Sequence, residues 1–270
     1  MNHPELTVER VRHELKLRQL TVARVERIAG QIIRVTLSGD DLHDFVTASF
    51  DDHVKIFFPE HPGGPMAQPV LGPNGLSFPE DQPRPLARDY TPRRFDRERR
   101  ELVIDFILHD DGPASNWAAQ AQAGQTLFIG GPRGSFVVPT GFDWHVLIGD
   151  ETALPAIGRR LEELPEQTQA IVRIEVAQAA NEIPLASKAK LDLQWLHRNG
   201  VPAGASTLLP EAAARLALPE GEGYVWVAAE SAAAQAVREV MVTQHQIGKR
   251  RIRASSYWKR GASGVHETLE

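Results

Sequence analysis

The first half of the chain alternates apolar and polar residues over short stretches. Thr21–Ile28 and Ile32–Ser38 are rich in Val, Ile and Thr, and Gly30 marks a turn between them. Val54–Phe58 is a further short apolar run, and apolar side chains occupy every second position of Glu101–His109. Short strands separated by Gly and Pro are typical of a small antiparallel β-barrel.

The pattern changes after Pro139, where short apolar runs alternate with helical segments. This alternation predicts a doubly wound α/β domain with a parallel sheet, so the fold class is α+β with two domains. We place the domain boundary near residues 138–144, because Pro139-Thr140-Gly141 interrupts two apolar strands. The expected strands are His145–Ile148, Ala170–Val176, Leu193–His197, Tyr224–Ala228 and Ile252–Tyr257, and the expected helices are Ala153–Leu164, Pro210–Ala217 and Ser231–Gln244.

The start of the chain has a different periodicity. Val8, Val11 and Leu15 follow helical spacing, which predicts an amphipathic helix over Pro4–Lys16. We therefore expect residues 1–18 to form an N-terminal helical extension, residues 19–140 the β-barrel domain and residues 141–270 the α/β domain. A long loop, Pro59–Pro85, contains eight of the nineteen prolines; loops of this length are usually functional or mobile.

Composition removes several kinds of chemistry. The chain of 270 residues has no cysteine, which excludes disulfides, thiolate zinc sites and cysteine-ligated iron–sulfur clusters. The ten histidines show no metal-binding spacing, so we expect no protein-held metal. No apolar stretch approaches the ~18–20 residues that span a bilayer, and the charged N-terminus lacks a signal sequence. We therefore expect a cytoplasmic protein that does not enter membranes.

Charge is distributed unevenly. The net charge is −5, yet residues 84–100 contain seven arginines against three acids, and residues 241–266 contain six basic residues and no acid. Two basic segments in an acidic protein indicate either anionic ligands or solvated positive faces. Nucleic acid is not an expected partner, because the overall charge is negative and no helix-turn-helix or zinc module is visible.

Arg88-Asp89-Tyr90-Thr91 is a candidate flavin-binding motif. In a strand, Arg88 and Tyr90 project to the same face, where Tyr90 offers a ring for stacking and Arg88 a planar fork for phosphate. Thr91 is placed to form a hydrogen bond near the flavin N5. The alternative interpretation is a surface strand that carries a tyrosine and an arginine.

A second candidate follows the strand that ends at His109. Gly112-Pro113-Ala114-Ser115 is typical of a turn that opens a helix, with proline at the first helical position. The N–H groups of Ala114 and Ser115 would then form an anion site that suits a pyrophosphate. Taken alone, the same pattern describes many ordinary helix starts.

Six segments in order, from about Leu20 to the C-terminal region, give a family resemblance. The chain resembles the siderophore-interacting proteins, which are NADPH-dependent ferric-chelate or ferric-siderophore reductases of the ferredoxin reductase-like superfamily. The N-terminal segment lies outside the resemblance. The matching segments are HVKIFFP (53–59), RDYTPRRFD (88–96), DFILHDDGPASNWA (105–118), GGPRGSF (130–136), GDETALPAI (149–157) and SYWKRG (256–261).

The resemblance implies an FAD site in the barrel domain. The residues implied to hold the flavin are Arg88, Tyr90, Thr91 and Arg93, and those implied to surround the FAD phosphates and adenine side are His109, Gly112, Ala114, Ser115 and Trp117. The family often has glycine where this chain has Asp110 or Asp111. Two acids beside a pyrophosphate would repel it, so we expect them to point to solvent or to the ribose.

The resemblance also implies a nicotinamide site in the second domain. Thr152 and the backbone around Ala153 would donate to NADPH or NADH, while Asp150 and Glu151 also fit a helix start favoured by the dipole. Glu230 lies either near the nicotinamide or simply at the start of a helix. In the superfamily an aromatic residue near the C-terminus covers the flavin face, and Trp258 is the candidate here.

The basic C-terminal segment is the candidate substrate site. Ferric siderophores of catecholate or citrate type are anionic, so a basic rim would attract them. Some of the same residues have an alternative role at the 2′-phosphate of NADPH. The five residues assigned to this rim are Lys249, Arg250, Arg253, Lys259 and Arg260.

The resemblance implies an FAD-dependent oxidoreductase that passes electrons from NAD(P)H, with NADPH favoured, to the Fe(III) of a ferric siderophore and so releases Fe(II). No side chain is assigned a catalytic role, because the cofactor carries the redox chemistry. Two alternatives stay open: a reductase of the same superfamily that acts on a protein carrier or a quinone, and a non-catalytic siderophore-binding protein. A monomer is the expected state.

Overall fold

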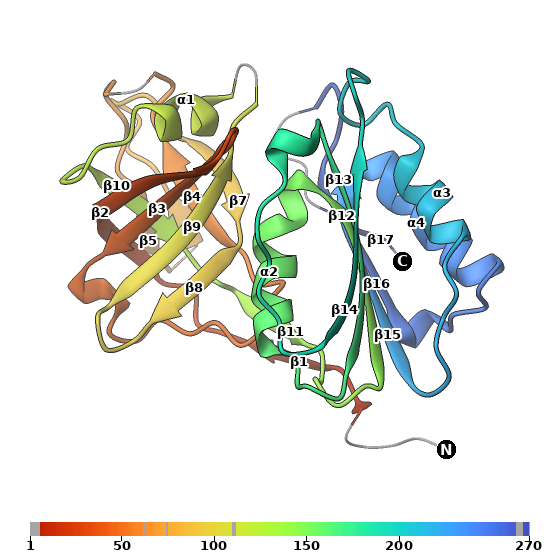
Figure 1. Cartoon of the computed structure of the whole chain (residues 1–270). Coiled ribbons are helices and arrows are strands. Elements are labelled where there is room, and N and C mark those ends of the chain that lie inside the picture. Colours follow the sequence, from red (N-terminus) through yellow and green to blue (C-terminus); the bar gives the residue numbers. More distant parts are fainter. Residues whose placement is uncertain (1–5, 62, 74, 110–111, 263–266, 270) are drawn as a thin grey trace. The chain divides into compact units, whose positions relative to one another are not determined.

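A computed structural model describes residues 6–61, 63–73, 75–109, 112–262 and 267–269 of the chain. Two compact units are present (Figure 1). One covers Val8–Val138 and the other begins at Pro139, and Leu6 and Thr7 belong to the second. Leu6 links to this second unit, since its carbonyl accepts a hydrogen bond from Arg251 Nη1 at 3.1 Å. Among the described residues, no helix is long and apolar enough to cross a membrane.

The first unit contains a curled antiparallel sheet of seven strands, which confirms the predicted barrel architecture. The strand order is β7-β4-β10-β2-β3-β9-β8. The strands are β2 (Leu17–Ala29), β3 (Ile32–Ser38), β4 (Val54–Phe58), β7 (Leu86–Tyr90), β8 (Pro92–Asp96), β9 (Glu101–Ile107) and β10 (Thr126–Gly130).

The curl of this sheet follows from one short connection. The two edge strands, β7 and β8, are consecutive in the chain, and only Thr91 separates them. In a flat sheet, six inter-strand spacings of about 4.8 Å would place these edges roughly 29 Å apart. Tyr90 and Pro92 are two residues apart in the chain, which spans at most about 7 Å. The sheet must therefore curl until its two edges meet at Thr91.

Alternation along the strands fills the barrel with apolar side chains. On β3 and β9, Val35 pairs with Ile104 and Leu37 with Leu102, and all four are buried. Helix α1 (Pro113–Ala119) packs on this core through Trp117, which is 6% exposed. Strand β3 therefore has the predicted bounds, and β9 begins at the predicted residue but ends at Ile107 rather than His109.

The N-terminal helix prediction is wrong. Glu9–Arg12 forms strand β1, which pairs antiparallel with β11 (Gly134–Val137). A side chain at position 134 would lie 2.6 Å from the Val11 carbonyl, so glycine permits this close pairing. Val11 is 38% exposed, which shows that the helical spacing of the valines does not mark a buried stripe. Residues 8–18 belong to the first unit rather than to a separate extension.

The proline-rich segment 59–85 is not a plain loop. It contains a two-stranded hairpin of β5 (Val70–Gly72) and β6 (Gly75–Ser77). Val70 is 50% exposed, so this hairpin contributes little to the core.

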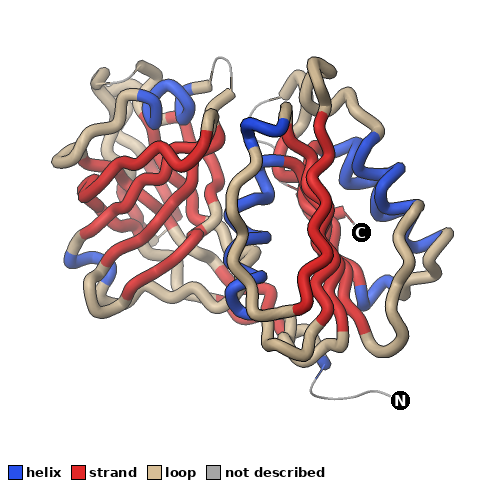
Figure 2. Tube along the Cα trace, in the orientation of Figure 1, coloured by secondary structure: helices blue, strands red, loops and turns tan. Residues whose placement is uncertain are grey.

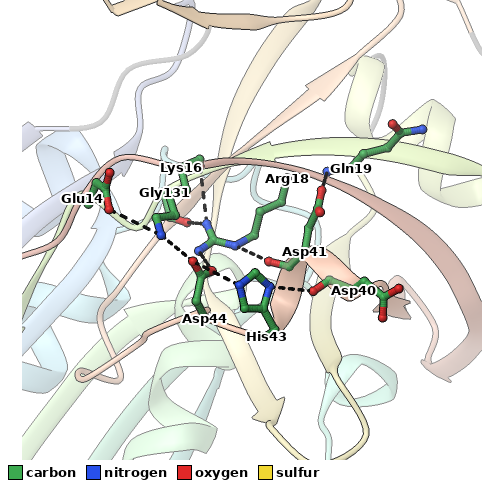
Figure 3. A network of polar contacts seen from close by, with 9 residues as sticks. All are labelled: Glu14, Lys16, Arg18, Gln19, Asp40, Asp41, His43, Asp44 and Gly131. Atoms are coloured by element: carbon green, nitrogen blue, oxygen red, sulfur yellow. Dashed lines mark hydrogen bonds and ion pairs between the residues drawn. The ribbon is translucent and has the colours of Figure 1, made fainter.

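A buried arginine fixes the base of the barrel (Figure 3). Arg18 is 5% exposed, and it donates from Nε to the Asp41 carbonyl at 2.9 Å and from Nη2 to Asp44 Oδ1 at 2.9 Å. Its Nη1 donates to the Gly131 carbonyl at 3.2 Å. Hydrogen bonds from Lys16 and then Arg18 hold the pKa of Asp44 down to about 2. This network ties the turn η2 (Asp40–Leu42) and the end of β10 to the start of β2.

The second unit confirms the predicted doubly wound sheet. Its strand order is β14-β13-β12-β15-β16-β17. The first five strands are parallel, and the last is antiparallel to its neighbour. The strands are β12 (Trp144–Asp150), β13 (Gln169–Val176), β14 (Lys190–His197), β15 (Gly223–Glu230), β16 (Ile252–Trp258) and β17 (Glu267–Leu269).

Helices cover both faces of this sheet (Figure 2). Helix α2 (Leu154–Glu163) lies on one face, and α3 (Leu208–Ala214) and α4 (Ser231–Thr243) lie on the other. From β12 the chain moves outward to β13 and β14, then returns through α3 to β15 on the other side of β12. The strand order reverses here, so the carboxyl ends of β12 and β15 mark the switch point where such sheets bind ligands.

Candidate functional site

Tyr90 ends strand β7 beside an aromatic cluster. Its ring centroid lies 4.5 Å from that of Phe106 and 6.3 Å from that of Phe58. Trp117 completes the cluster at 5.5 Å from Phe106. Burial raises the pKa of the Tyr90 hydroxyl, which therefore stays protonated near neutral pH. The Tyr90 ring is half-buried, so it is supported from the core and still presents surface to a planar ligand.

Strand alternation separates the side chains of the RDYT motif. Asp89 forms an ion pair of 2.7 Å with Lys55 on the neighbouring strand. Arg88 is half-buried, and its Nη1 donates to the Ala87 carbonyl at 2.8 Å. Thr91, which lies at the seam where the sheet edges β7 and β8 meet, is 7% exposed, and Arg93 is half-buried on β8. Arg88 and Tyr90 are thus alternate residues of one strand, as the sequence predicts, and that strand lies at an edge of the sheet.

The turn before α1 is shaped by His109 and Gly112. A methyl group on Gly112 would lie 2.6 Å from His109 Cε1, so the imidazole stacks against the bare backbone. The His109 N–H donates to Ser115 Oγ at 3.2 Å. Asp110 and Asp111, whose role the sequence left open, lie outside the described residues.

The start of α1 leaves backbone donors for an anion. Pro113 occupies the first turn, and Gly112 provides no side-chain cap. The N–H groups of Ala114 and Ser115 have no partners within the helix, as in every first helical turn. These donors, the His109 ring and the half-buried Tyr90 fit a flavin dinucleotide. Trp117, in contrast, is a core residue with little surface left for a cofactor.

Asp150 lies at the switch point of the second unit. Its carboxylate is 5% exposed and accepts four hydrogen bonds. Oδ1 accepts from the Thr152 N–H at 2.9 Å and from the Thr152 hydroxyl. Oδ2 accepts from the Glu230 N–H at 2.9 Å and from Trp258 Nε1 at 2.8 Å. Burial, and then the nearby Glu151, raise the pKa of Asp150 to about 6.

Glu230 ends the neighbouring strand and caps helix α4. Its Oε2 accepts from the N–H groups of Ala232 at 2.7 Å and Ala233 at 3.3 Å. Its Oε1 accepts from the Arg260 N–H at 3.2 Å. The helix-start interpretation of Glu230 is therefore correct, although this carboxylate also holds a residue beyond β16.

Thr152 and Ala153 have roles that the sequence did not predict. Both Thr152 donors are directed to Asp150, and Ala153 is fully buried. A methyl group on Gly149 would lie 2.4 Å from Ala153 Cβ and 2.5 Å from the Ala228 carbonyl. The first strand-to-helix turn therefore packs directly on β15, and glycine makes that approach possible.

A buried ion-pair network at the same edge was missed by the sequence reasoning. Arg198 is 7% exposed and forms two hydrogen bonds with Glu151, at 2.6 and 2.7 Å. It also contacts Glu175 Oε1 at 3.3 Å. These residues follow or end β14, β12 and β13, so one signal was available. Two acids near the ends of neighbouring parallel strands repel each other when buried, so a basic residue at the end of a third strand predicts an ion pair with them.

The structure does not gather the five basic residues into one rim. Lys249 and Arg250 lie in η5 (Lys249–Arg251), which precedes β16, and Arg253 is the second residue of that strand. Lys259 and Arg260 follow its other end. Seven strand residues at about 3.3 Å each separate the two groups by roughly 23 Å. Of the five, Lys259 and Arg260 are those at the carboxyl edge with Asp150 and Glu230.

Comparison with known proteins identifies the family. The siderophore-interacting FAD-binding domain matches residues 21–136, and the siderophore-interacting protein domain matches residues 142–261. The NADPH-dependent ferric-chelate reductase of Escherichia coli K12 is 36% identical over 261 residues, which are 96% of this chain and 99% of the relative. The chain belongs to the siderophore-interacting protein family. The predicted resemblance is thus confirmed.

Two further family members extend the comparison. The ferric vibriobactin reductase of Vibrio cholerae is 34% identical over 247 residues, which are 90% of each chain. The crystal structure of a siderophore utilization protein from T. fusca has a TM-score of 0.88 and 38% identity, and covers 96% of this chain and 98% of its own. The two-unit architecture is therefore that of the family.

Proposed function

We propose that this protein is a reductase that passes electrons from NADPH through FAD to the Fe(III) of a ferric siderophore, which releases Fe(II). The observation that carries the proposal is the match, over nearly the full length of both chains, to an NADPH-dependent ferric-chelate reductase. A second relative is named for the reduction of ferric vibriobactin. Iron enters as part of the substrate.

The barrel unit supplies the proposed FAD site. Tyr90 packs against the flavin ring, and Thr91 and Arg93 lie on the same chain segment. Arg88 offers its guanidinium to a phosphate, and the first turn of α1 offers backbone N–H groups to the pyrophosphate. Bound flavin supplies the redox chemistry, because it takes two electrons from a nicotinamide and releases them singly. The side chains bind and orient the reactants.

The switch point of the second unit is the proposed NADPH site, since ligands of doubly wound sheets bind beyond the carboxyl ends of the strands. Lys259 and Arg260 are exposed at this edge, where they attract an anionic ferric siderophore. Lys249 and Arg250 are also exposed, but they lie at the opposite end of β16 and serve as a matched control. We further propose that the protein is a cytoplasmic monomer.

The test measures flavin content and iron reduction. Purified protein supplied with FAD is expected to be yellow and to lose its visible absorbance when NADPH is added without oxygen. Addition of a ferric siderophore is expected to restore the absorbance and to release Fe(II) to a ferrous chelator. A protein that leaves the spectrum of added FAD unchanged would refute the proposal. Turnover with a quinone or protein carrier, but no ferric chelate, would reassign it within the superfamily.

Paired charge variants test the substrate site. The double variant Lys259→Ala/Arg260→Ala is expected to raise KM for an anionic ferric siderophore more than for a neutral one. The double variant Lys249→Ala/Arg250→Ala removes the same charge and is expected to leave both values near those of the parent. Equal losses for both substrates, or for both double variants, would refute the assigned charge role.

A further inference from the structure

The two carboxylates at the switch point have little capacity left for a ligand. Asp150 receives two donors on each oxygen, and Glu230 receives two on Oε2 and one on Oε1. The two residues are 5% and 4% exposed. An anionic cofactor would also be repelled by both groups. Both carboxylates therefore act as acceptors for hydrogen-bond donors of the protein itself.

Each carboxylate has one partner from the segment that ends β16. Asp150 holds the Trp258 indole, 108 residues away in sequence, through Nε1. Glu230 holds the backbone N–H of Arg260. Trp258 and Arg260 are themselves only two residues apart, so two anchors on neighbouring strands fix one short segment. This segment also carries Lys259, and both basic side chains remain exposed.

A glycine in another loop packs against the same two side chains. A methyl group on Gly204 would lie 3.0 Å from the tip of the Trp258 ring and 2.8 Å from Glu230 Cγ. The indole is therefore hydrogen-bonded at Nε1 and touched at its far end. Its orientation is determined by three elements: the ends of β12 and β15, and the 204 loop.

We propose that Asp150 and Glu230 are positioning residues with separate tasks: Asp150 sets the orientation of Trp258 for the NADPH step, and Glu230 sets the position of the Lys259–Arg260 turn for the ferric substrate. The kinetic part of this inference rests on the proposed function. The structural part does not, because the state of the Trp258 ring is measurable without turnover.

The first experiment is a double-mutant cycle on FAD-loaded protein. Trp258→Phe keeps an aromatic ring and removes Nε1, whereas Asp150→Asn replaces one of the two acceptor oxygens by an NH2 group, which cannot accept a hydrogen bond. Each is expected to lower kcat/KM for NADPH about tenfold, the size expected for one hydrogen bond to a charged group. The loss in the double variant is expected to be smaller than the product of the two single losses, since the bond between Trp258 and Asp150 is common to both changes. Multiplied losses would overturn the role of Asp150.

A spectroscopic readout separates positioning from general damage. The Trp258 signal is the fluorescence of a protein minus that of the same protein carrying Trp258→Phe. In Asp150→Asn this difference signal is expected to become more accessible to acrylamide, while the summed signal of the other tryptophans is unchanged. An unaltered Trp258 signal would overturn the inference. If the parent lacks ferric-chelate reductase activity, the proposed function fails while this readout still tests the anchor.

Glu230→Asp isolates the second anchor from helix capping. Aspartate is a preferred N-cap, so it keeps the bonds to the start of α4. It is one methylene shorter, and the Arg260 contact is already 3.2 Å long. We expect KM for an anionic ferric siderophore to rise several-fold and kcat/KM for NADPH to stay within twofold. Equal effects on the two substrates would overturn the division of tasks.

Two glycine variants provide a test that removes no hydrogen-bonding group. Gly204 has φ of +70° and Gly200 has φ of +96°, so alanine is strained at either position. An added methyl at 200 meets nothing within 4 Å, whereas at 204 it meets Trp258 and Glu230. Gly204→Ala is expected to change the Trp258 signal and the KM for both substrates, while Gly200→Ala leaves all three unchanged. Identical behaviour of the two variants would contradict the packing part of the inference.

Discussion

His145 predicts a specific loss of stability in acid. It lies on β12 and is 1% exposed. Burial, and then the positive charge of Arg160, lower the pKa of His145 to about 3 from its ordinary value of 6.5. The folded protein therefore resists protonation of an imidazole that the unfolded chain protonates readily. The stability linked to this neutral histidine is complete above pH 6.5 and is lost as pH falls toward 3.

The magnitude follows from proton linkage. The difference between the two pKa values corresponds to about 5 kcal/mol at about 1.36 kcal/mol per pKa unit, and this stability is fully lost only below pH 3. At pH 5, roughly 2 kcal/mol is lost relative to pH 8. Asp150 acts in the opposite direction, because its raised pKa favours folding below pH 6. A comparison of variants with the same Asp150 cancels that contribution.

Urea unfolding at pH 8 and pH 5 measures this effect. Four of the five tryptophans lie beyond residue 139, so their fluorescence reports mainly on the α/β unit. His145→Asn removes the titrating ring, and we expect the loss between pH 8 and pH 5 to be about 2 kcal/mol smaller than in the parent. His43→Asn changes an exposed histidine and is the control. Equal pH dependence in parent and His145→Asn would refute the reasoning.

Three further predictions concern other positions. Asp44→Asn is expected to destabilise the protein at pH 7 by an amount that shrinks as pH falls from about 4 to 2, because the pKa of this carboxyl is about 2 when folded; melting curves at several pH values check it. Gly149→Ala is expected to lower the melting temperature markedly, since its methyl would lie 2.5 Å from the Ala228 carbonyl. Gly112→Ala is expected to weaken FAD binding, measured by titration, with little change in the melting temperature of flavin-free protein, because the exposed His109 ring can move aside.

Local pattern was sufficient for most of the fold. Ile32–Ser38 and Val54–Phe58 form strands with the predicted bounds, because both runs are rich in residues that pack on a pleated, buried surface. The helix predicted over Pro4–Lys16 is wrong because a distant partner, and not the local pattern, determines the structure of this segment. The partner of Glu9–Arg12 lies more than a hundred residues away, and no local signal announces that pairing. Val11 is exposed in β1, whereas Val8 and Leu15 lie outside that strand, so their helical spacing does not mark one buried face.

The candidate site was predictable only where one strand holds it. Arg88 and Tyr90 are neighbours on β7, so alternation is enough to place them. Asp150 and Trp258 meet only after the sheet forms, and a short sequence cannot reveal that contact. The prediction of a single basic rim is wrong because residues that are close in sequence are not close in space here. Strand β16 separates Arg250 from Lys259.

The seam at Thr91 also restricts how this protein can be rebuilt. Chain termini of most domains can be moved to surface loops, but a circular permutant opened at Thr91 would retain every strand and lose the link that draws β7 and β8 together. The proposed flavin motif is the closure of the barrel itself. A library that varies the length of this segment would therefore select for folding before it could select for cofactor preference.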